Sequence, residues 1–156
     1  MPLVLNSSSI SGLAAVGGLS SPQTGSVLQV VNNTFTSSFS SSSGTFVSIG
    51  LTASITPTSS SSKILVLIDS FVRSDSANFV DATIYKNSTN LGGQYGLKNA
   101  YANAAFVMPV PFAYYDSPAT TSSTSYTLYM RTENATTFYL EASGRISSIT
   151  LMEIAA

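Results

Sequence analysis

The sequence predicts an all-β protein: an antiparallel β-sandwich or jelly roll of about eight strands with an extended N-terminal arm. Three observations predict this fold class. Short segments with apolar and polar residues in alternation recur along the chain, and clusters of Ser, Thr, Asn, Gly and Pro separate them. Strong helix formers are sparse, whereas β-branched and aromatic residues are abundant. No segment shows a convincing 3.6-residue apolar period.

Residues 1–25 are predicted to form the arm. They show no sustained period of two or of 3.6, and they are too apolar for a free, solvated tail. We therefore expect this segment to pack against another protein or against copies of itself; a floppy leader is the alternative. The aliphatic residues expected to anchor the chain are Leu3, Leu5, Ile10, Leu13, Val16 and Leu19.

Residues 26–156 are predicted to form one β-sandwich domain, which opens with a short candidate strand at 26–31. The clearest strand is 45–55, because every second residue from Val47 to Ile55 is apolar and Ser, Gly or Thr stands between. The serine-rich patches at 38–43 and 59–62 are expected to be loops, and Pro57 ends the strand before the second of them.

The second half of the chain continues the β pattern. Residues 64–72 are an apolar run of strand length, typical of burial on both faces, and in an antiparallel protein the second buried face indicates a subunit interface. Residues 94–103 are ambiguous. Residues 104–115 alternate again, but Pro109 and Pro111 cannot donate to a ladder, so this strand is expected at an edge or with a bulge. The other expected strands are 78–85, 125–132, 136–141 and 145–154.

Ionisable residues are few. The chain has six basic and seven acidic residues, no His and no Cys, and its first ionisable side chain is Lys63. Without His or Cys, the Ser-His-Asp and Cys-His arrangements and the common zinc sites are excluded. Two carboxylates that meet in space could still serve a glycosidase, but scattered acids are more typical of surface charges. We therefore expect no enzyme, no cofactor and no metal.

The net charge of −1 also restricts the partners. Nucleic acids and anionic membranes call for clustered Lys and Arg, and the six basic residues here are scattered. No apolar stretch approaches the ~20 residues needed to span a bilayer, and residues 1–25 lack the pattern of a secretory signal. A net charge near zero gives little colloidal repulsion, so the chain is expected to associate, and a neutral monomer is the alternative.

The densest group of charges is Asp69, Arg73, Asp75 and Asp81. Several oxygen ligands close together are typical of a calcium site, and the same charges could form a salt-bridge network at an interface. We favour a third interpretation, in which they are solvated charges near a strand end.

Tyrosines are numerous, and those of the segment 94–103 stand beside Asn and Gln. Tyrosine rings can stack on sugars while neighbouring amides bond the hydroxyl groups, so Tyr95, Asn99 and Tyr101 are candidate glycan contacts. Ordinary cross-strand packing is the alternative, and we favour it.

The sequence also resembles a family. The N-terminal segments MPLVLNSSSISGL and GLSSPQTGSVLQVV, together with LTASITPTSSSSKILVLI, YYDSPATTSSTSYTLYMRT and SSITLMEIAA, resemble the short tail-fibre-like and other virion structural proteins of tailed bacteriophages. The resemblance implies a homotrimer of jelly-roll or sandwich domains, attached to the virion by the N-terminal arm and without catalytic residues. The chain lacks a long stalk, so a capsid-decorating knob or cement protein is an alternative to a tail fibre.

On this interpretation the protein is located in the virion, and its partners are itself, another virion protein held by residues 1–25 and, for the receptor-binding alternative, a host surface glycan. Apolar strands would supply the subunit interface. The residues expected there are Leu65, Leu67, Phe71 and Leu151.

Overall fold

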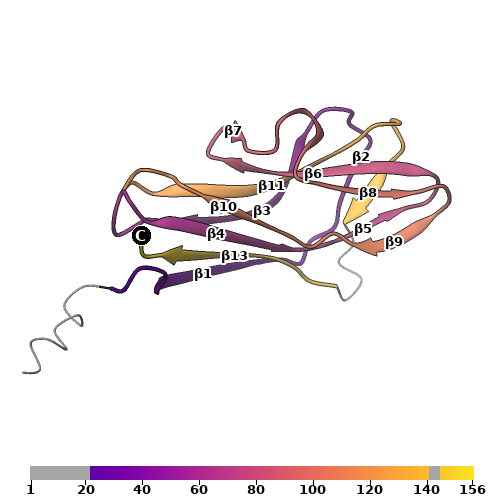
Figure 1. Cartoon of the computed structure of the whole chain (residues 1–156). Helices are drawn as coiled ribbons and strands as arrows, with labels where there is room; N and C mark the ends of the chain where they lie inside the picture. Colours follow the sequence, from indigo (N-terminus) through magenta and orange to yellow (C-terminus); the bar gives the residue numbers. More distant parts are fainter. Residues whose placement is uncertain (1–21, 141–144) are drawn as a thin grey trace, which may run out of the picture.

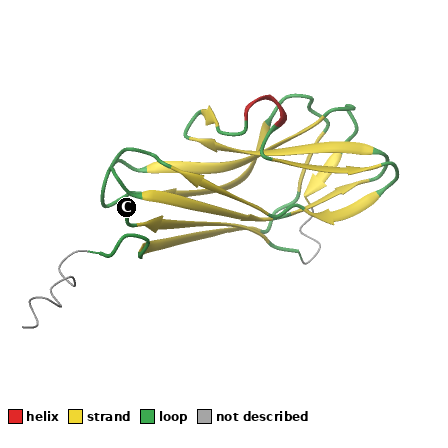
Figure 2. Ribbon diagram, viewed as in Figure 1, coloured by secondary structure: helices red, strands yellow, loops and turns green. Residues whose placement is uncertain are grey.

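The computed structural model describes residues 22–140 and 145–156. The six expected anchoring residues, Leu3 to Leu19, lie outside this range. Strands dominate the described part, and its one helical element is the 3₁₀ turn η2 (Gly93–Tyr95), drawn in red in Figure 2. None of its helices has the length and apolarity required to cross a membrane.

Thirteen strands make up the described part, in three antiparallel sheets. Their bounds are β1 (Val27–Phe35), β2 (Phe39–Ser41), β3 (Val47–Ile55), β4 (Lys63–Asp69), β5 (Phe71–Ser74), β6 (Asn78–Lys86), β7 (Thr89–Asn90), β8 (Lys98–Ala102), β9 (Phe106–Pro109), β10 (Phe112–Asp116), β11 (Thr124–Thr132), β12 (Phe138–Leu140) and β13 (Ser147–Ile154). The predicted all-β fold is confirmed, as a jelly-roll-like sandwich.

Two of the sheets form one bent layer. Their strand orders are β1-β13-β4-β10 and β2-β12-β5-β9, so each strand of one sheet continues along the chain into the strand at the same position of the other (Figure 1). We call this pair of sheets the long layer. At its bend the amide of Val110 donates to the carbonyl oxygen of Ser70, 2.7 Å away. Pro109 and Pro111 flank this bend, and β9 and β10 lie at sheet edges, as the two prolines predict.

The third sheet, β3-β11-β6 with β7 and β8 beside β6, covers the long layer and is called the facing sheet. The core lies between the two layers. Every second residue of β3, from Ile49 to Ile55, is buried there, and so are Ile64, Val66 and Ile68 of β4. Each Leu, Ile or Val fully removed from water contributes about 1.5–3 kcal/mol.

Several boundaries differ from those expected. The serine-rich segment 38–43 contains β2, whose residues pair with Phe138–Leu140 of β12. The apolar run 64–72 is divided at Ser70 into β4 and β5, one on each side of the bend. β1 extends beyond residue 31, because its backbone pairs with β13 as far as Phe35. The side-chain amides of Asn32 and Asn33 add bonds to Thr150 and to the carbonyl oxygen of Thr52. The ambiguous segment 94–103 contains η2 and β8.

One end of the sandwich holds both ends of the described chain (Figure 1). The amide of Gly25 donates to Ala155 O at 2.7 Å, and the amide of Ala155 donates to Ser26 O at 2.9 Å. Pro22 and Ala156 line one shared hollow at this end. Pro22 and Gly25, which belong to the predicted arm 1–25, therefore lie beside the C-terminal residues.

Candidate functional site: the outer faces of the sandwich

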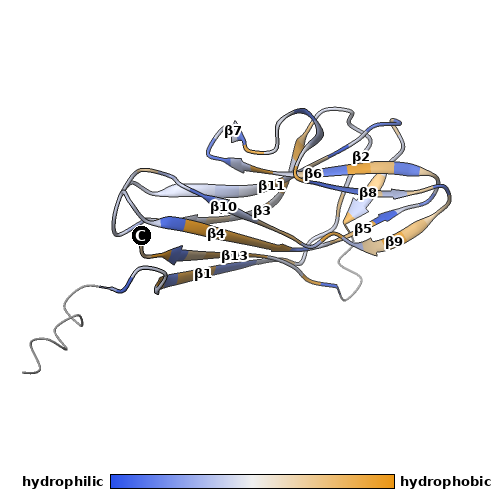
Figure 3. Cartoon of the chain, in the orientation of Figure 1, coloured by the Kyte–Doolittle hydropathy of each residue, from blue (hydrophilic) through white to orange (hydrophobic). Residues whose placement is uncertain are grey.

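The outer side of the sheet β1-β13-β4-β10 carries apolar side chains, and we call it the apolar face. Directly opposed residues of antiparallel strands point to the same side of a sheet. The register therefore sets Val30, Met152, Leu65 and Tyr115 in one row across all four strands. Val30 and Tyr115 are 56% and 58% exposed, and Leu65 and Met152 are half-buried. Figure 3 shows β4 and β13 largely in the orange of apolar residues.

Neighbouring rows of the apolar face are also uncharged in their middle. The next row holds Asn32, Thr150, Leu67 and Ala113. Charges occur only at the two ends of β4, where Lys63 begins the strand and Asp69 ends it. The Lys63 ammonium donates to Ser117 at 2.9 Å, and among the described residues neither Lys63 nor Asp69 forms an ion pair.

The outer side of the facing sheet is different, and we call it the polar face. The outward residues of β3 are Ser48, Gly50, Thr52 and Ser54, all exposed. The hydroxyl oxygens of Thr52 and Thr127 lie 2.8 Å apart across β3 and β11. Beside them the rings of Tyr85 and Tyr129 stack with centroids 3.9 Å apart, so these tyrosines are partly covered by one another.

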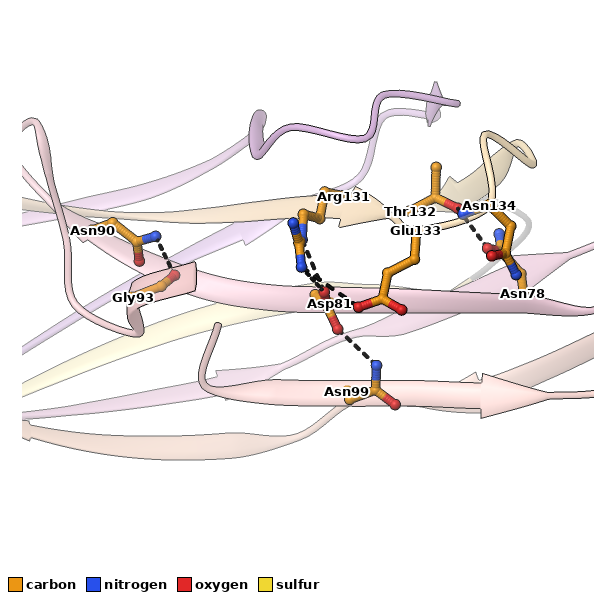
Figure 4. Close-up of polar contacts among 9 residues, drawn as sticks. All are labelled: Asn78, Asp81, Asn90, Gly93, Asn99, Arg131, Thr132, Glu133 and Asn134. Atoms are coloured by element: carbon orange, nitrogen blue, oxygen red, sulfur yellow. Dashed lines mark hydrogen bonds and ion pairs between the residues drawn. The ribbon is translucent and has the colours of Figure 1, made fainter. Parts of the chain in front are cut away.

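A buried ion pair lies on the β8 side of this polar face (Figure 4). Asp81 is 2% exposed. Its carboxylate accepts hydrogen bonds from Arg131 Nε at 2.9 Å and from Asn99 Nδ2 at 2.7 Å, and a second Arg131 nitrogen lies 2.8 Å away. Glu133 adds a contact of 3.5 Å to the same guanidinium. The pair therefore ties β6, β11 and β8 together.

These contacts test the interpretations offered for the charged group Asp69, Arg73, Asp75 and Asp81. Asp81 is not a solvated strand-end charge, because it is buried against Arg131, which lies 50 residues further along the chain. Asp75 and Asp69 are exposed, as that interpretation predicts, and Asp75 pairs with Arg73 at 2.8 Å. The described residues contain no group of three or more His, Cys, Asp or Glu that could hold a metal ion.

The three candidate glycan contacts lie on two elements. Asn99 and Tyr101 share one side of β8, where the ring of Tyr101 stacks on Phe79 with centroids 4.1 Å apart. Tyr101 is still 50% exposed, whereas the amide of Asn99 is engaged with Asp81. Tyr95 is 67% exposed on η2, so the expected single loop is a turn followed by a strand.

The four residues expected at a subunit interface do not lie together on one surface. Leu65 and Leu67 both lie on the apolar face. Phe71 lies beyond the bend on β5, under the guanidinium of Arg145, whose carbon is 5.8 Å from the ring centroid. Leu151 is a correction to the prediction: it is 0% exposed and packs in the core of its own subunit, so its side chain does not reach an outer face.

A second buried acid, Glu153, lies behind the apolar face and was not expected from the sequence. It is 0% exposed, and no Lys or Arg of the described chain pairs with it. Burial alone would raise the pKa of this carboxyl, but hydrogen bonds from Gln29 at 2.6 Å and from the hydroxyl and amide of Thr58 at 2.7 Å lower the pKa to about 2.

The third buried acid, Asp116, is the partner of two side chains. Lys86 lies 3.0 Å from its carboxylate, and the hydroxyl of Tyr126 donates to it at 2.7 Å. Burial and the neighbouring Asp116 together raise the pKa of Tyr126 above its ordinary value. Asp81, Asp116 and Glu153 thus all hold the fold together through donors of their own chain.

No known protein family matches the chain, and no curated protein matches it by sequence. Solved structures give distant likenesses. A chain of the T13 particle of infectious bursal disease virus aligns with 84% of this chain and 37% of its own length, at 16% identity and a TM-score of 0.49. A chain of T=1 particles derived from the same virus covers 84% and 37%, at 14% identity and a TM-score of 0.48.

The xylan-binding domain CBM22-1 of Xyn10C from Paenibacillus barcinonensis also aligns. It covers 87% of this chain and 99% of its own length, at 13% identity and a TM-score of 0.35. The chain spans just over a third of the length of the two viral particle chains and nearly the whole length of the xylan-binding domain.

Proposed function

We propose that this chain is a non-enzymatic structural protein of a bacteriophage virion, a homotrimer exposed on the particle surface and attached through residues 1–25, as a tail fibre or as a capsid decoration. The observation that carries the proposal is the apolar face. A sheet face with Val30, Met152, Leu65 and Tyr115 in one row is typical of a surface covered by other protein.

The hydrogen bonds and ion pairs of the buried acids support a structural role. A catalytic carboxylate must have an oxygen available to substrate or water. In Asp81, Asp116 and Glu153 both carboxylate oxygens accept hydrogen bonds or ion pairs from donors of the same chain. These acids stabilise strand contacts, and all three are buried away from solvent.

The elements found at the two ends of the sandwich support attachment through the arm. Pro22 and the C-terminal residues share one end of the sandwich, and β5, β9 and β12 lie at the other (Figure 1). An arm bound to a virion at the first end would leave the second end facing outward.

The test is deletion of residues 1–21, which retains the hydrogen bond from Gly25 to Ala155. The truncated protein is expected to fold and to assemble with itself, but to be lost from purified particles. Incorporation at the level of the full chain would contradict the anchor. The copy number per particle, measured against the major capsid protein, distinguishes a capsid site from a tail site.

A second candidate function, recognition of a host glycan, is favoured by one observation. The ring of Tyr101 is fixed by Phe79 and half exposed, beside the side chain of Asn99. A rigid, accessible aromatic ring next to polar groups suits stacking on a sugar.

A glycan array tests this candidate with the variant Tyr101→Ala and the matched control Val107→Ala, which shortens a similarly exposed side chain on β9, outside the apolar face. Binding that is lost in the first variant and kept in the second supports recognition by β8. An array without hits for the unmodified protein contradicts it.

A further inference from the structure

Of the four residues that the sequence predicts at the interface of a homotrimer, only Leu65 and Leu67 lie together on one outer face. The apolar face is the strongest candidate for that interface, because it combines apolar character with a lack of charge. Between Lys63 and Asp69, no residue of the face that the structure describes is acidic or basic. Such a face offers nothing to a charged partner, and it is complementary to an equally uncharged surface.

The dimensions of the sheet are informative about the number of copies. Four strands spaced about 4.8 Å apart give a face roughly 19 Å wide. If three such faces form the sides of a triangular prism, the centre of each face lies about 5–6 Å from the axis, which is half the roughly 10 Å spacing of packed sheets. Side chains of the two central strands, β13 and β4, would then fill the interior.

The residues on these strands fit that interior. Leu65 and Leu67 of β4 and Met152 of β13 are the half-buried apolar residues nearest the middle of the face. The edge strands β1 and β10 would meet at the corners, where Val30 of one copy approaches Tyr115 of the next. One row of four residues, repeated in each copy, therefore closes into a ring.

The area is also sufficient. The eight residues of β13 make the face about 27 Å long, so each copy would bury roughly 500 Å² of sheet and three copies about 1,500 Å². Removing one copy would expose its own 500 Å² and about as much on its two neighbours, roughly 1,000 Å² in total, which is the lower end for a stable protein interface. Each copy contacts its neighbours through different edges, and three such contacts close without leaving an open end.

We propose that the apolar face lines the threefold axis of a homotrimer, with the sheets β1-β13-β4-β10 of three copies as the walls of a triangular prism. This inference rests on the proposed homotrimer and names its interface. Lys63 and Asp69 lie at the two rims, where they remain in water. The polar face points away from the axis on all three copies.

The experiment is the solution mass of the full chain and two variants by size-exclusion chromatography with light scattering. Leu65→Glu places a carboxylate on the axis and is expected to reduce the mass from three chains to one. Ser48→Glu makes the matched change on the exposed polar face and is expected to leave three chains. Circular dichroism identifies any variant that fails to fold.

Covalent crosslinking between copies tests the same interface and does not depend on how well the Leu65→Glu variant folds. The chain has no cysteine, so Leu65→Cys introduces a single thiol at the proposed axis. On the proposed axis the Cα atoms of residue 65 in neighbouring copies would lie about 10 Å apart, beyond the reach of a disulfide. A thiol-reactive crosslinker of about that span is therefore expected to link chains of Leu65→Cys and not those of Ser48→Cys.

The outcomes separate this inference from the proposed function. A trimeric Leu65→Glu variant without a Leu65→Cys crosslink would overturn the interface and leave the homotrimer standing. A dimeric wild-type protein that Leu65→Glu dissociates would overturn the prism in favour of two faces packed against each other. A monomeric wild-type protein would contradict both proposals.

Discussion

The two outer faces of this sandwich differ although their inner faces are alike. β3 and β4 both bury every second residue in the core, and their inward residues are mostly Ile, Leu and Val. Outward, β3 carries Ser48, Gly50, Thr52 and Ser54, whereas β4 carries Leu65 and Leu67. Figure 3, which colours inward and outward residues alike, shows β11 paler than β13. The core of one subunit requires only the inner pattern, and the outer difference is the observation on which the proposed subunit interface rests.

If the polar face takes no part in assembly, its stabilising contacts lie within one subunit. Among these contacts, loss of the Asp81–Arg131 ion pair is expected to lower the free energy of unfolding most. Arg131→Ala leaves the buried carboxylate of Asp81 without its cation, and we expect a loss of about 3–5 kcal/mol in the free energy of unfolding, measured by urea denaturation. The double variant Asp81→Leu with Arg131→Leu should recover much of this loss. A single variant as stable as the wild type would show that the pair contributes little.

Behind the apolar face, Glu153 gives a pH-dependent effect. Its pKa is lowered to about 2 from an ordinary value of 4.5, so its contribution is fully present above pH 4.5 and is lost as the pH falls toward 2. The shift corresponds to about 3 kcal/mol. We expect Glu153→Gln to reduce the pH dependence of the unfolding free energy between these values. An unchanged pH profile would place the acid sensitivity of the fold elsewhere.

On the polar face, a hydroxyl pair gives the smallest expected effect. Thr52→Val removes the contacts of the Thr52 hydroxyl with Thr127 and with the carbonyl oxygen of Tyr126. Because the site is partly exposed, the free energy of unfolding should fall by no more than about 1 kcal/mol. The solution mass should not change. A variant with an altered mass would mean that the polar face also takes part in assembly.

Regular alternation made much of the fold predictable. The pattern from Val47 to Ile55 identifies both the strand and its inward side, and the two prolines near residue 110 correctly predict an edge. In β13 both alternating sets include apolar residues, Ile149 and Leu151 on one side and Met152 and Ile154 on the other. The sequence therefore does not say which side is buried, and Leu151 was assigned to the wrong one.

The features that the sequence does not predict depend on long-range contacts. The burial of Asp81 depends on Arg131 and Asn99 from two other strands, and the burial of Glu153 depends on Gln29 at the start of β1. No local sequence pattern predicts such distant partners. The bend at Ser70 was also missed, because the apolar run passes through it and the hydrogen bond that marks it comes from Val110.

The central claim is that the apolar face is covered by copies of the same chain. The solution mass of the unmodified protein, measured by light scattering over a range of concentrations, tests it most directly. We predict a mass of three chains that persists on dilution. A mass of one chain at all concentrations would contradict the claim and leave the apolar face without its proposed partner.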